Sequence, residues 1–474
     1  MPATVYNRTR RVATTRQSRN AKNYINRLPT ELLAGIFVLL YTSARDQYKL
    51  SSYFKAAVLS VCRHWRAIVM STPALWTEIS IAPSKGPWTL DHLLKRLNTI
   101  VPRAGILPIH VIWDQPPSVG NRVFAKLVGR LFQLAPAYRW KELTVRNNRP
   151  VTPRPDAQPF TSLQRLALSE LKSTHYILSL LELSRATPSY VKIDGLIDRS
   201  IMSPVAPIFE STTDLQISRN SEGRIHRFFP NVRKLRIENL KLYRQLASCS
   251  HLTELRVLYA DMRDLALLSA SRVELIWVDT LTYSAYRDSF TLSTVKNLQA
   301  LSGCLWSLAS LGAPNLEKLT LGNKRDTLER GNAIMSHVLQ HSQYSWSPTT
   351  ATLYMPMEIA TFSRFLCRSE RLQHVSFVLD KHACSNVDEL VDVFSRTHGE
   401  GNNANFVCPN LRTIRLVLRW NKAGSKLEKV GLERFPLVVW REVADSILAV
   451  RLGTPLTSVK YEWEDEHLMV DDYE

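Results

Sequence analysis

The feature that most constrains the fold is an apolar triplet with the spacing L-x-x-L-x-L, which recurs along most of the chain. The copies that fit it best begin at Leu163, Val232, Leu252, Val273, Leu316, Leu372, Leu411 and Leu456. Weaker copies lie at 191–193, 214–217 and 353–355. The last two apolar positions are two residues apart, which predicts a short strand with one buried face. Intervals of 20 residues from Val232 to Leu252 and 21 from Leu252 to Val273 predict stacked units.

A longer interval governs residues 77–145, where strand-like and helix-like patterns alternate. We predict strands at 77–81, 108–113 and 140–145 and helices at 90–97 and 123–134. Ile79, Val111 and Leu143, one in each predicted strand, are separated by 32 residues each time. Alternation of strand and helix at a fixed interval is typical of stacked repeats.

The triplets resemble an irregular leucine-rich-repeat array. Many copies lack the Asn or Cys that follows the third apolar position in regular leucine-rich repeats, so an even horseshoe is not expected. The longer intervals from Leu372 to Leu411 and from Leu411 to Leu456 indicate insertions or missed copies. The resemblance implies an α/β fold in which an irregular leucine-rich-repeat-like α/β solenoid follows a short all-α N-terminal segment.

The all-α segment contains two helix-forming runs between Leu28 and Trp76. In the first, Pro29 suits a helix start and Glu31 complements the positive end of the helix dipole. Apolar residues at 32, 33, 36, 37 and 40 then predict one apolar stripe. The second run, residues 58–69, is predicted as one helix that ends before Pro73. So short a pair of helices should lean on a partner or on the rest of the chain.

This segment resembles an F-box, in the variant common in large fungal families. The motif is Leu-Pro-x-Glu-Leu-Leu-x-x-Ile-Phe at 28–37, Leu-Ser-Val-Cys-Arg-x-Trp-Arg-x-Ile at 59–68 and Ser-Thr-Pro-x-Leu-Trp at 71–76. Between them, Tyr41 to Lys55 is expected to be a loop longer than in compact F-boxes. The resemblance implies binding of a Skp-family linker protein and, through it, of a cullin–RING ubiquitin ligase. Residues matching the motif, which would form or support the linker-binding surface, are Leu28, Pro29, Glu31, Leu32, Ile36, Phe37, Leu59, Val61, Cys62 and Trp65.

Among these residues, Val61 and Trp65 are expected to be mainly structural. The F-box resemblance implies a substrate-recognition subunit of the ligase, a non-catalytic adaptor of the cytoplasm, the nucleus or both. Three alternatives stay open: a helical hairpin that only caps the repeats, a receptor that no longer binds the linker, and a basic repeat scaffold that binds nucleic acid or acidic proteins without ligase assembly. Interleaved aromatic residues or a groove-reading helix would favour nucleic acid, and the sequence shows neither clearly.

A substrate-binding face is predicted from strand alternation, because the residues between the apolar positions share the opposite face. The expected substrate-binding residues are Arg146, Arg165, Lys234, Arg236, Arg256, Trp277, Lys318, His374 and Arg415. Carboxylates at 142, 238, 254 and 279 share this face, so it is basic only on balance. The whole chain has a net charge of +19. Together with this charge, the face predicts an acidic or phosphorylated protein segment as substrate; the alternative is that its residues are only solvated strand residues.

No catalytic motif, cofactor or metal site is expected. The sequence contains no nucleophile elbow, phosphate loop or His-Glu-x-x-His pattern. The cysteines are scattered without a Cys-x-x-Cys pair, which predicts reduced thiols rather than disulfides or zinc ligands. No apolar window approaches 18 residues, and residues 1–24 lack the apolar core of a secretory signal, so neither a membrane span nor secretion is expected.

The expected domain order is a basic tail at 1–24, the F-box at 25–76, the repeat domain at 77–461 and an acidic tail at 462–474. The basic tail is interpreted as a solvated segment, with a nuclear-import or nucleic-acid-binding arm and a mitochondrial transit peptide as alternatives. The acidic tail is interpreted as a solvated terminus, and self-masking of a basic face is the alternative.

Overall fold

The structure is a computed structural model that divides into two compact units, Met1–Asp194 (unit 1) and Gly195–Tyr473 (unit 2). It describes residues 24–46, 50–81, 89–114, 120–146, 160–169, 181, 186–195, 206–218, 225–240, 246–282, 288–323, 326–340, 346–380, 387–395, 397–398, 405–406, 408–419, 435–451 and 454–464. The predicted basic tail up to residue 23 lies outside these ranges.

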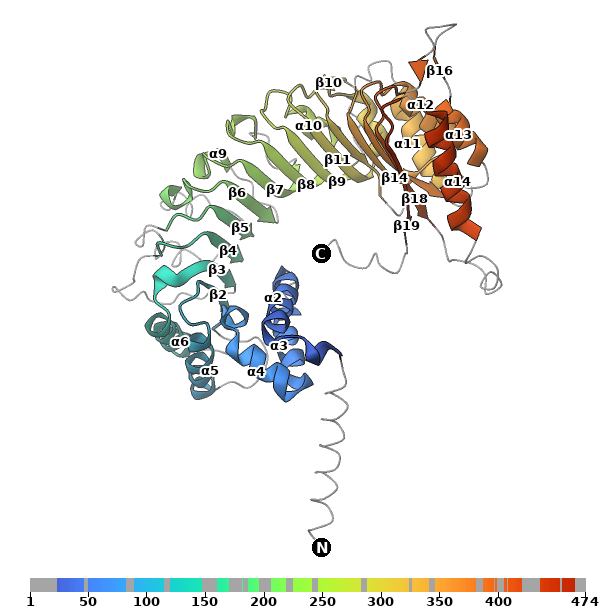
Figure 1. The fold of residues 1–474 in the computed structure, drawn as a ribbon. Coiled ribbons are helices and arrows are strands. Elements are labelled where there is room, and N and C mark those ends of the chain that lie inside the picture. Colours follow the sequence, from blue (N-terminus) through green and yellow to red (C-terminus); the bar gives the residue numbers. More distant parts are fainter. Residues whose placement is uncertain are drawn as a thin grey trace. The chain divides into compact units, whose positions relative to one another are not determined.

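Unit 1 begins with helices and continues with parallel strands (Figure 1). The helical segment comprises η1 (Tyr24–Arg27), α2 (Thr30–Asp46), α3 (Leu50–Val61), α4 (Arg63–Ser71) and η2 (Pro73–Trp76). The predicted loop from Tyr41 to Lys55 is therefore wrong, because α2 continues to Asp46 and α3 already starts at Leu50. Phe54 of α3 packs against Tyr41 with ring centroids 6.1 Å apart, so helical structure here buries apolar side chains that a loop would leave in water.

The single helix predicted for residues 58–69 is in fact two helices, α3 and α4, which meet at Cys62. Cys62 has extended backbone (φ −157°, ψ 169°), and its Sγ accepts a hydrogen bond from the Trp65 N–H at 3.4 Å. A residue with this geometry caps the start of a helix, since it satisfies an N–H that has no partner inside the first turn. The helix is interrupted at Cys62, so the buried residues Val58 and Ile68 belong to different helices, α3 and α4.

The sheet of unit 1 is parallel, with strand order β1-β2-β3-β4-β5. Its elements are β1 (Glu78–Ser80), α5 (Leu90–Arg103), β2 (Ile109–Asp114), α6 (Asn121–Leu134), η3 (Ala137–Arg139), β3 (Trp140–Arg146), β4 (Arg165–Ser169) and β5 (Tyr190–Asp194). Ile79 pairs with Val111, and Val111 pairs with Leu143. The 32-residue interval therefore marks one turn of chain from each strand to the next, and the predicted helices are confirmed as α5 and α6.

Large aromatic side chains join α6 to the sheet of unit 1. Phe132 of α6 stacks on Trp140 of β3 with ring centroids 4.8 Å apart, and Phe160 meets Trp140 edge-on at 5.3 Å. The indole N–H of Trp140 donates to the Ala135 carbonyl at 2.9 Å, so its one polar atom is satisfied in the core. These contacts fix α6 on one face of the sheet.

The sheet of unit 2 is also parallel, with strand order β6-β7-β8-β9-β11-β13-β14-β15-β18-β19. These strands are β6 (Asp214–Ser218), β7 (Lys234–Asn239), β8 (Glu254–Ala260), β9 (Leu275–Leu281), β11 (Asn297–Gly303), β13 (Lys318–Leu321), β14 (Thr350–Pro356), β15 (His374–Asp380), β18 (Thr413–Arg419) and β19 (Ser458–Glu464). Two small sheets join β10 (Phe290–Thr291) to β12 (Leu311–Gly312) and β16 (Thr397–His398) to β17 (Asn405–Phe406).

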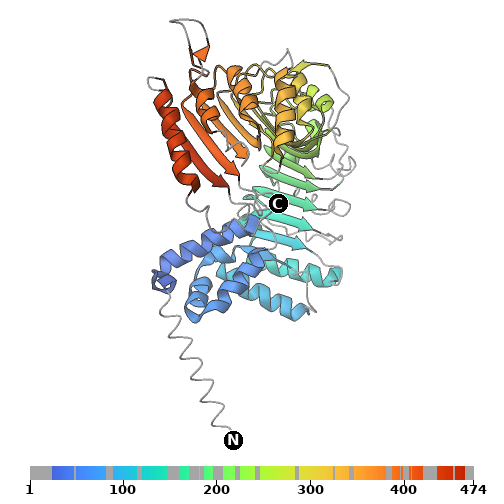
Figure 2. The ribbon, with the colours of Figure 1, turned by 90° about the vertical axis from the view of Figure 1, so that its right-hand side faces the viewer.

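Helical segments line one face of the unit 2 sheet, short in its first part and longer toward its end (Figures 1 and 2). They are η5 (Ala206–Phe209), α9 (Ile225–Phe228), η7 (Leu246–Ser248), α10 (Met262–Ala266), η8 (Leu305–Ser310), α11 (Leu328–Gln340), α12 (Ile359–Cys367), α13 (Val387–Ser395) and α14 (Phe435–Val450). Figure 2 shows the longer helices, in orange and red, side by side. The opposite face has no described helix on it, and we call it the open face.

The apolar triplets form strands in register. Leu235 pairs with Leu255, which pairs with Ile276, and each of the three is fully buried. Sequence analysis missed β11, whose triplet starts at Val295 and has Ala300 in place of a large third residue. In the two longest intervals β15 pairs directly with β18 and β18 with β19. The intervening chain contains α13, the β16–β17 hairpin and α14, so these intervals are insertions.

Within unit 2, asparagine side chains connect neighbouring repeats at the turns before the strands. The sequence Pro-Asn followed by an apolar residue precedes β7, β13 and β18. The amide of Asn231 donates to the Glu210 carbonyl at 2.7 Å, and that of Asn315 donates to the Ser293 carbonyl at 2.7 Å. Asn410 makes the equivalent bond to the Glu370 carbonyl at 3.2 Å. Each side-chain amide therefore donates to a backbone carbonyl of the preceding repeat, which an apolar side chain could not do.

The end of the sheet extends into the segment predicted as an acidic tail. β19 continues to Glu464, and Glu462 and Glu464 pair with Val417 and Arg419 of β18. Residues 465–474 lie outside the described ranges. Arg451, which follows α14, is buried and donates to the Phe394 carbonyl at 2.8 Å, so it ties α14 to the end of α13.

Candidate functional site

Helix α2 has two apolar stripes instead of the single stripe predicted from the sequence. Leu33, Phe37 and Tyr41 follow each other at intervals of four residues, and all three are buried. Phe37 packs against Trp65 of α4 with ring centroids 4.9 Å apart. This stripe closes the small core that α2 shares with α3 and α4, and it explains why the helix folds onto its neighbours.

The second stripe of α2 faces solvent. Leu32 is 56% exposed, Leu39 72% and Leu40 51%, while Ile36 between them is half-buried. Val61, the last residue of α3, adds another apolar side chain that is 50% exposed. One exposed leucine is ordinary on a protein surface, but three on one helix are typical of a surface that binds another protein.

The predicted linker-binding residues divide by exposure. Pro29, Glu31, Leu32 and Val61 are exposed, whereas Leu28, Ile36, Leu59, Cys62 and Trp65 are half-buried, and Phe37 is buried. Phe37 and Trp65 therefore support the surface from behind, and Cys62 caps α4. The exposure of Val61 differs from the structural role expected for it. Sequence analysis did not single out Leu39, because one apolar stripe accounted for the pattern and a second was not sought.

Trp76 joins the helical segment to the rest of unit 1. Its indole N–H donates to the Val69 carbonyl at 2.8 Å, and the Arg103 guanidinium of α5 lies 4.7 Å from its ring centroid. The Lys55 ammonium lies 4.7 Å from the centroid of Tyr41 and 5.8 Å from that of Trp76. Burial lowers the pKa of Lys55 to about 8; the charge of Glu78 acts against this, and that of Arg96 adds to it.

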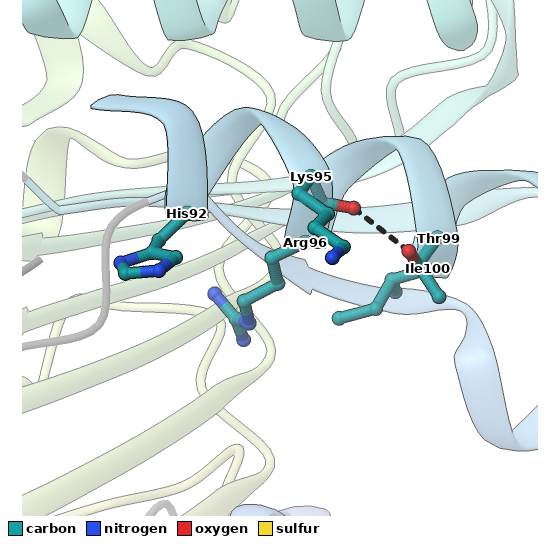
Figure 3. Close-up of a pocket in the computed structure, with 5 residues that line it drawn as sticks. All are labelled: His92, Lys95, Arg96, Thr99 and Ile100. Atoms are coloured by element: carbon teal, nitrogen blue, oxygen red, sulfur yellow. Dashed lines mark hydrogen bonds between the residues drawn. The ribbon is translucent and has the colours of Figure 1, made fainter. Parts of the chain in front are cut away.

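A shallow hollow of about 380 Å³ lies along α5 and is lined by His92, Lys95, Arg96, Thr99 and Ile100 (Figure 3). Arg96 donates to the Ser80 carbonyl at 3.0 Å, and burial lowers the pKa of its guanidinium. The hydroxyl of Thr99 donates to the Lys95 carbonyl at 2.7 Å. The hollow is thus the basic side of one helix, and its arginine already serves to anchor that helix to β1.

In unit 1, a row of paired residues that alternates with the core positions crosses the strands. His110 of β2 is buried between two carboxylates, with Nδ1 4.0 Å from Glu78 and 3.9 Å from Glu142. Its Nε2 lies 2.9 Å from the Thr144 hydroxyl. Arg165 lies 3.9 Å from the other oxygen of Glu142, and its guanidinium is 4.8 Å from the Tyr190 ring centroid. Arg165, predicted to bind substrate, therefore belongs to this row, in unit 1 with Arg146.

The open face of unit 2 brings four of the predicted substrate-binding residues together on β7, β8 and β9. Arg236 pairs with Arg256, and Arg256 pairs with Trp277. The Arg256 guanidinium lies 4.6 Å from the Trp277 ring centroid, and the indole N–H of Trp277 donates to Asp279 at 2.6 Å. Arg236, Arg256 and Trp277, with Lys234 beside them, are called the arginine–tryptophan cluster below.

Glu254 offsets part of the positive charge of this cluster. One of its oxygens lies 3.2 Å from the Lys234 ammonium, and the other accepts from Nε of Arg256 at 2.9 Å. Burial acts to raise the pKa of Glu254, but the hydrogen bonds and charges of Lys234 and Arg256 outweigh it and lower the pKa overall. Burial raises the pKa of Asp279, against the Trp277 hydrogen bond and the Arg256 charge. These contacts hold Arg256 and Trp277 in place.

The remaining predicted residues of the open face lie farther along the sheet. Lys318 is exposed on β13 and Arg415 on β18. His374 of β15 lies with Nδ1 2.8 Å from the Thr413 hydroxyl and is half-buried. These three lie on separate strands beyond β11 and do not join the cluster. A hollow of about 450 Å³ at the turns before β9, β11 and β13 is lined by charges of both signs, and includes the Lys296–Glu274 pair at 3.1 Å.

Within the described ranges, no group of three or more His, Cys, Asp or Glu side chains is arranged to hold a metal ion. The described cysteines are unpaired thiols, and burial raises the pKa of Cys408 to about 12 and that of Cys249 to about 11. Cys384 and His382 lie outside the described ranges. Of the helices that the structure describes, none has the length and apolar character needed to span a bilayer.

Comparison with known proteins identifies the N-terminal segment. A family model described as F-box-like matches residues 25–82, the stretch that contains α2, α3, α4, η2 and β1. No curated protein matches the chain. The expected F-box is therefore supported over the segment on which it was predicted.

Proposed function

We propose that the chain is the substrate-recognition subunit of a Skp–cullin–F-box ubiquitin ligase. The observation that carries this proposal is the exposed stripe of α2, Leu32, Leu39 and Leu40, within the segment that matches the F-box-like family. A helix that uses one apolar stripe for its own core and presents a second to solvent suits capture of an apolar groove or helix on a linker protein. Burying these leucines would supply the association energy.

The remaining chain would present the substrate. The parallel strands and recurrent apolar triplets are consistent with an irregular leucine-rich-repeat-like solenoid, and its open face offers exposed polar side chains in fixed register. The cluster on β7, β8 and β9 is the proposed substrate contact, with Lys318, His374 and Arg415 as outer contacts in unit 2. Arg146 and Arg165 of unit 1 stay separate predictions. The covalent chemistry would belong to other subunits, and this chain would supply proximity.

The test is capture of a purified Skp-family linker by the full chain. Replacing Leu28 and Pro29 with Ala should weaken capture while the strands stay folded, because these residues open the F-box motif. Ile106→Ala is a matched control, since Ile106 is an exposed apolar residue of unit 1 outside the F-box segment. Undiminished capture by the Leu28→Ala, Pro29→Ala variant would count against the assignment of this surface, and no capture by the natural chain would refute the proposal.

A basic scaffold for nucleic acid remains the second hypothesis. The open face does not favour it, because Glu254 and Asp279 lie inside the most basic cluster and would repel a polyanionic backbone. Steeply salt-dependent binding to arbitrary DNA would support it.

A further inference from the structure

The last strand of the unit 2 sheet, β19, has a long outer edge. In the order of the paired strands β19 follows β18 and comes last (Figure 1). Its backbone is in register with β18 from Ser458 to Glu464, and no strand among the described residues pairs with its other side. A strand edge of this kind presents backbone N–H and C=O groups to which another strand can add.

The hydrogen bonds to β18 show which backbone groups of β19 point outward. The N–H of Ser458 donates to the carbonyl of Arg412, which directly precedes β18, at 3.3 Å. In a parallel ladder the residues that bond to one neighbouring strand alternate along the chain. The outward N–H and C=O groups therefore belong to Val459, Tyr461 and Trp463. Their spacing suits three successive hydrogen-bonded pairs with a second strand.

β19 lacks the features that usually prevent an edge strand from pairing. Such strands are often very short, or are interrupted by proline or a bulge. β1, at the other end of the strand order, is a short edge of three residues. β19 has seven residues without proline or glycine, and its pairing with β18 shows no register shift. Its charged residues Lys460, Glu462 and Glu464 are of both signs, so they favour a partner whose charges follow the complementary order.

The sequence of β19 is complementary to itself when a second copy runs antiparallel. With a two-fold axis at Tyr461 all seven residues are paired, and Lys460 of each copy lies opposite Glu462 of the other. These two positions would be non-hydrogen-bonded pairs, in which the opposing Cα atoms come closest. Moving the axis to Lys460 or to Glu462 places like charges opposite each other, which destabilises the pairing. The charges therefore select one register, with a second copy as the partner.

We propose that two copies of the chain associate through β19, in antiparallel pairing centred on Tyr461, so that their unit 2 sheets become continuous. The outward backbone groups of Val459, Tyr461 and Trp463 would form the hydrogen bonds across the axis. Helix α14, which packs on β19, and its copy would lie on the same face of the joined sheet. Because the paired segment is short, association is expected in the micromolar range. This pairing does not depend on the proposed linker.

The experiment measures self-association of the full chain by analytical ultracentrifugation over a range of concentrations. Lys460→Glu and Glu462→Lys each place like charges opposite each other at both symmetric positions, and each should weaken self-association at least about tenfold. Lys126→Glu replaces an exposed lysine of α6 and should leave self-association unchanged. Lys460 pairs with Arg415 of β18, so Lys460→Glu adds an opposite charge beside an arginine and should not unfold the strand. Thermal unfolding checks each variant.

Complementary variants separate a specific contact from a general loss of structure. When the Lys460→Glu and Glu462→Lys proteins are labelled with different fluorophores and mixed, they should associate with each other more tightly than either does with itself. The reason is that one chain then has only acidic and the other only basic residues at positions 460 and 462. The double variant Lys460→Glu, Glu462→Lys should self-associate as the natural chain does, because the exchange restores opposite charges at both positions.

Four results would overturn the inference: a natural chain that stays monomeric well above micromolar concentration, a dimer that neither single reversal weakens, a mixture without restored association, or assemblies larger than a dimer. The last would mean that another surface associates, since a closed two-fold pair stops at two copies. Linker capture by α2 is measured separately, so failure of the β19 pairing leaves the proposed function untouched.

Discussion

Helix α2 and the strands β7 to β9 differ in how much of their apolar surface is exposed to solvent. On β7, β8 and β9 the apolar positions that alternate toward the helices are buried, as Leu235, Leu255 and Ile276 show. On α2 one apolar stripe is buried, whereas Leu32 and Leu39 face solvent. The triplet residues of the strands are thus buried within the chain, although Leu258 and Tyr259 near the end of β8 are exposed, whereas α2 presents a whole stripe to solvent.

This difference separates residues that maintain the fold from residues that are available to a partner. A mutation on a strand core position should act on stability, and a mutation on the exposed stripe should act on binding. The polar face of the strands resembles the exposed stripe of α2 in being available to a partner. Arg236 and Arg256 lie on a folded sheet but do not form part of its apolar core.

The largest effect on stability is expected for a buried strand residue. Leu255→Ala should lower the free energy of unfolding by about 2–5 kcal/mol, because Leu255 is fully buried between Leu235 and Ile276 and its removal leaves a cavity. Leu39→Ala should change it by less than about 0.5 kcal/mol, since Leu39 is exposed. Chemical denaturation of both variants measures the contrast, and equal losses would contradict the division between the two surfaces.

Lys55 should show a pH-dependent effect of intermediate size. Burial lowers its pKa from 10.5 to about 8, so the unfolded chain holds the proton more tightly. The cost of burying the charged ammonium is therefore present below pH 8 and is relieved as the pH rises toward 10.5.

Lys55→Met should accordingly raise stability near neutral pH by about 1–2 kcal/mol, less than the full shift implies because contacts with the Tyr41 and Trp76 rings are lost. The gain over the natural chain should shrink as the pH rises from about 8 toward 10.5. Urea denaturation of the two proteins at pH 7 and at pH 10 measures it, and a gain that grows with pH would show that Lys55 is not buried as a strained cation.

The asparagine hydrogen bonds between neighbouring repeats should give the smallest effect on stability. Asn315→Ala removes a hydrogen bond to the Ser293 carbonyl and should cost about 1 kcal/mol. Asn410→Ala should cost less, because its bond to the Glu370 carbonyl is longer at 3.2 Å. Thermal denaturation compares the two, and no loss in either variant would mean that water replaces the amide without penalty.

The positions of most strands of the large sheets could be predicted from the sequence, because the 32-residue interval and the apolar triplets each mark one strand per repeat. The pairing register was not predicted. β11 was missed because Ala300 is too small to complete a recognisable triplet. The first part of α3 was missed because polar residues of the 41–55 segment obscure the contact of Phe54 with Tyr41. The second stripe of α2 is invisible in the sequence because periodicity shows which residues are apolar but not which of them another helix covers. The neutralisation of Arg256 by Glu254 depends on side-chain rotamers within one strand.

The most direct test of the central claim is the affinity of the full chain for a purified Skp-family linker, measured for the natural protein and for a Leu32→Gln, Leu39→Gln, Leu40→Gln variant. A shortened chain that begins after Trp76 would be less informative, because it also loses the contact of Trp76 with Arg103 of α5. We predict that the triple variant stays folded and binds the linker more than about a hundredfold more weakly, while Ile106→Gln binds as the natural chain does. Undiminished affinity of a folded triple variant would contradict the claim that the exposed stripe of α2 grips the linker.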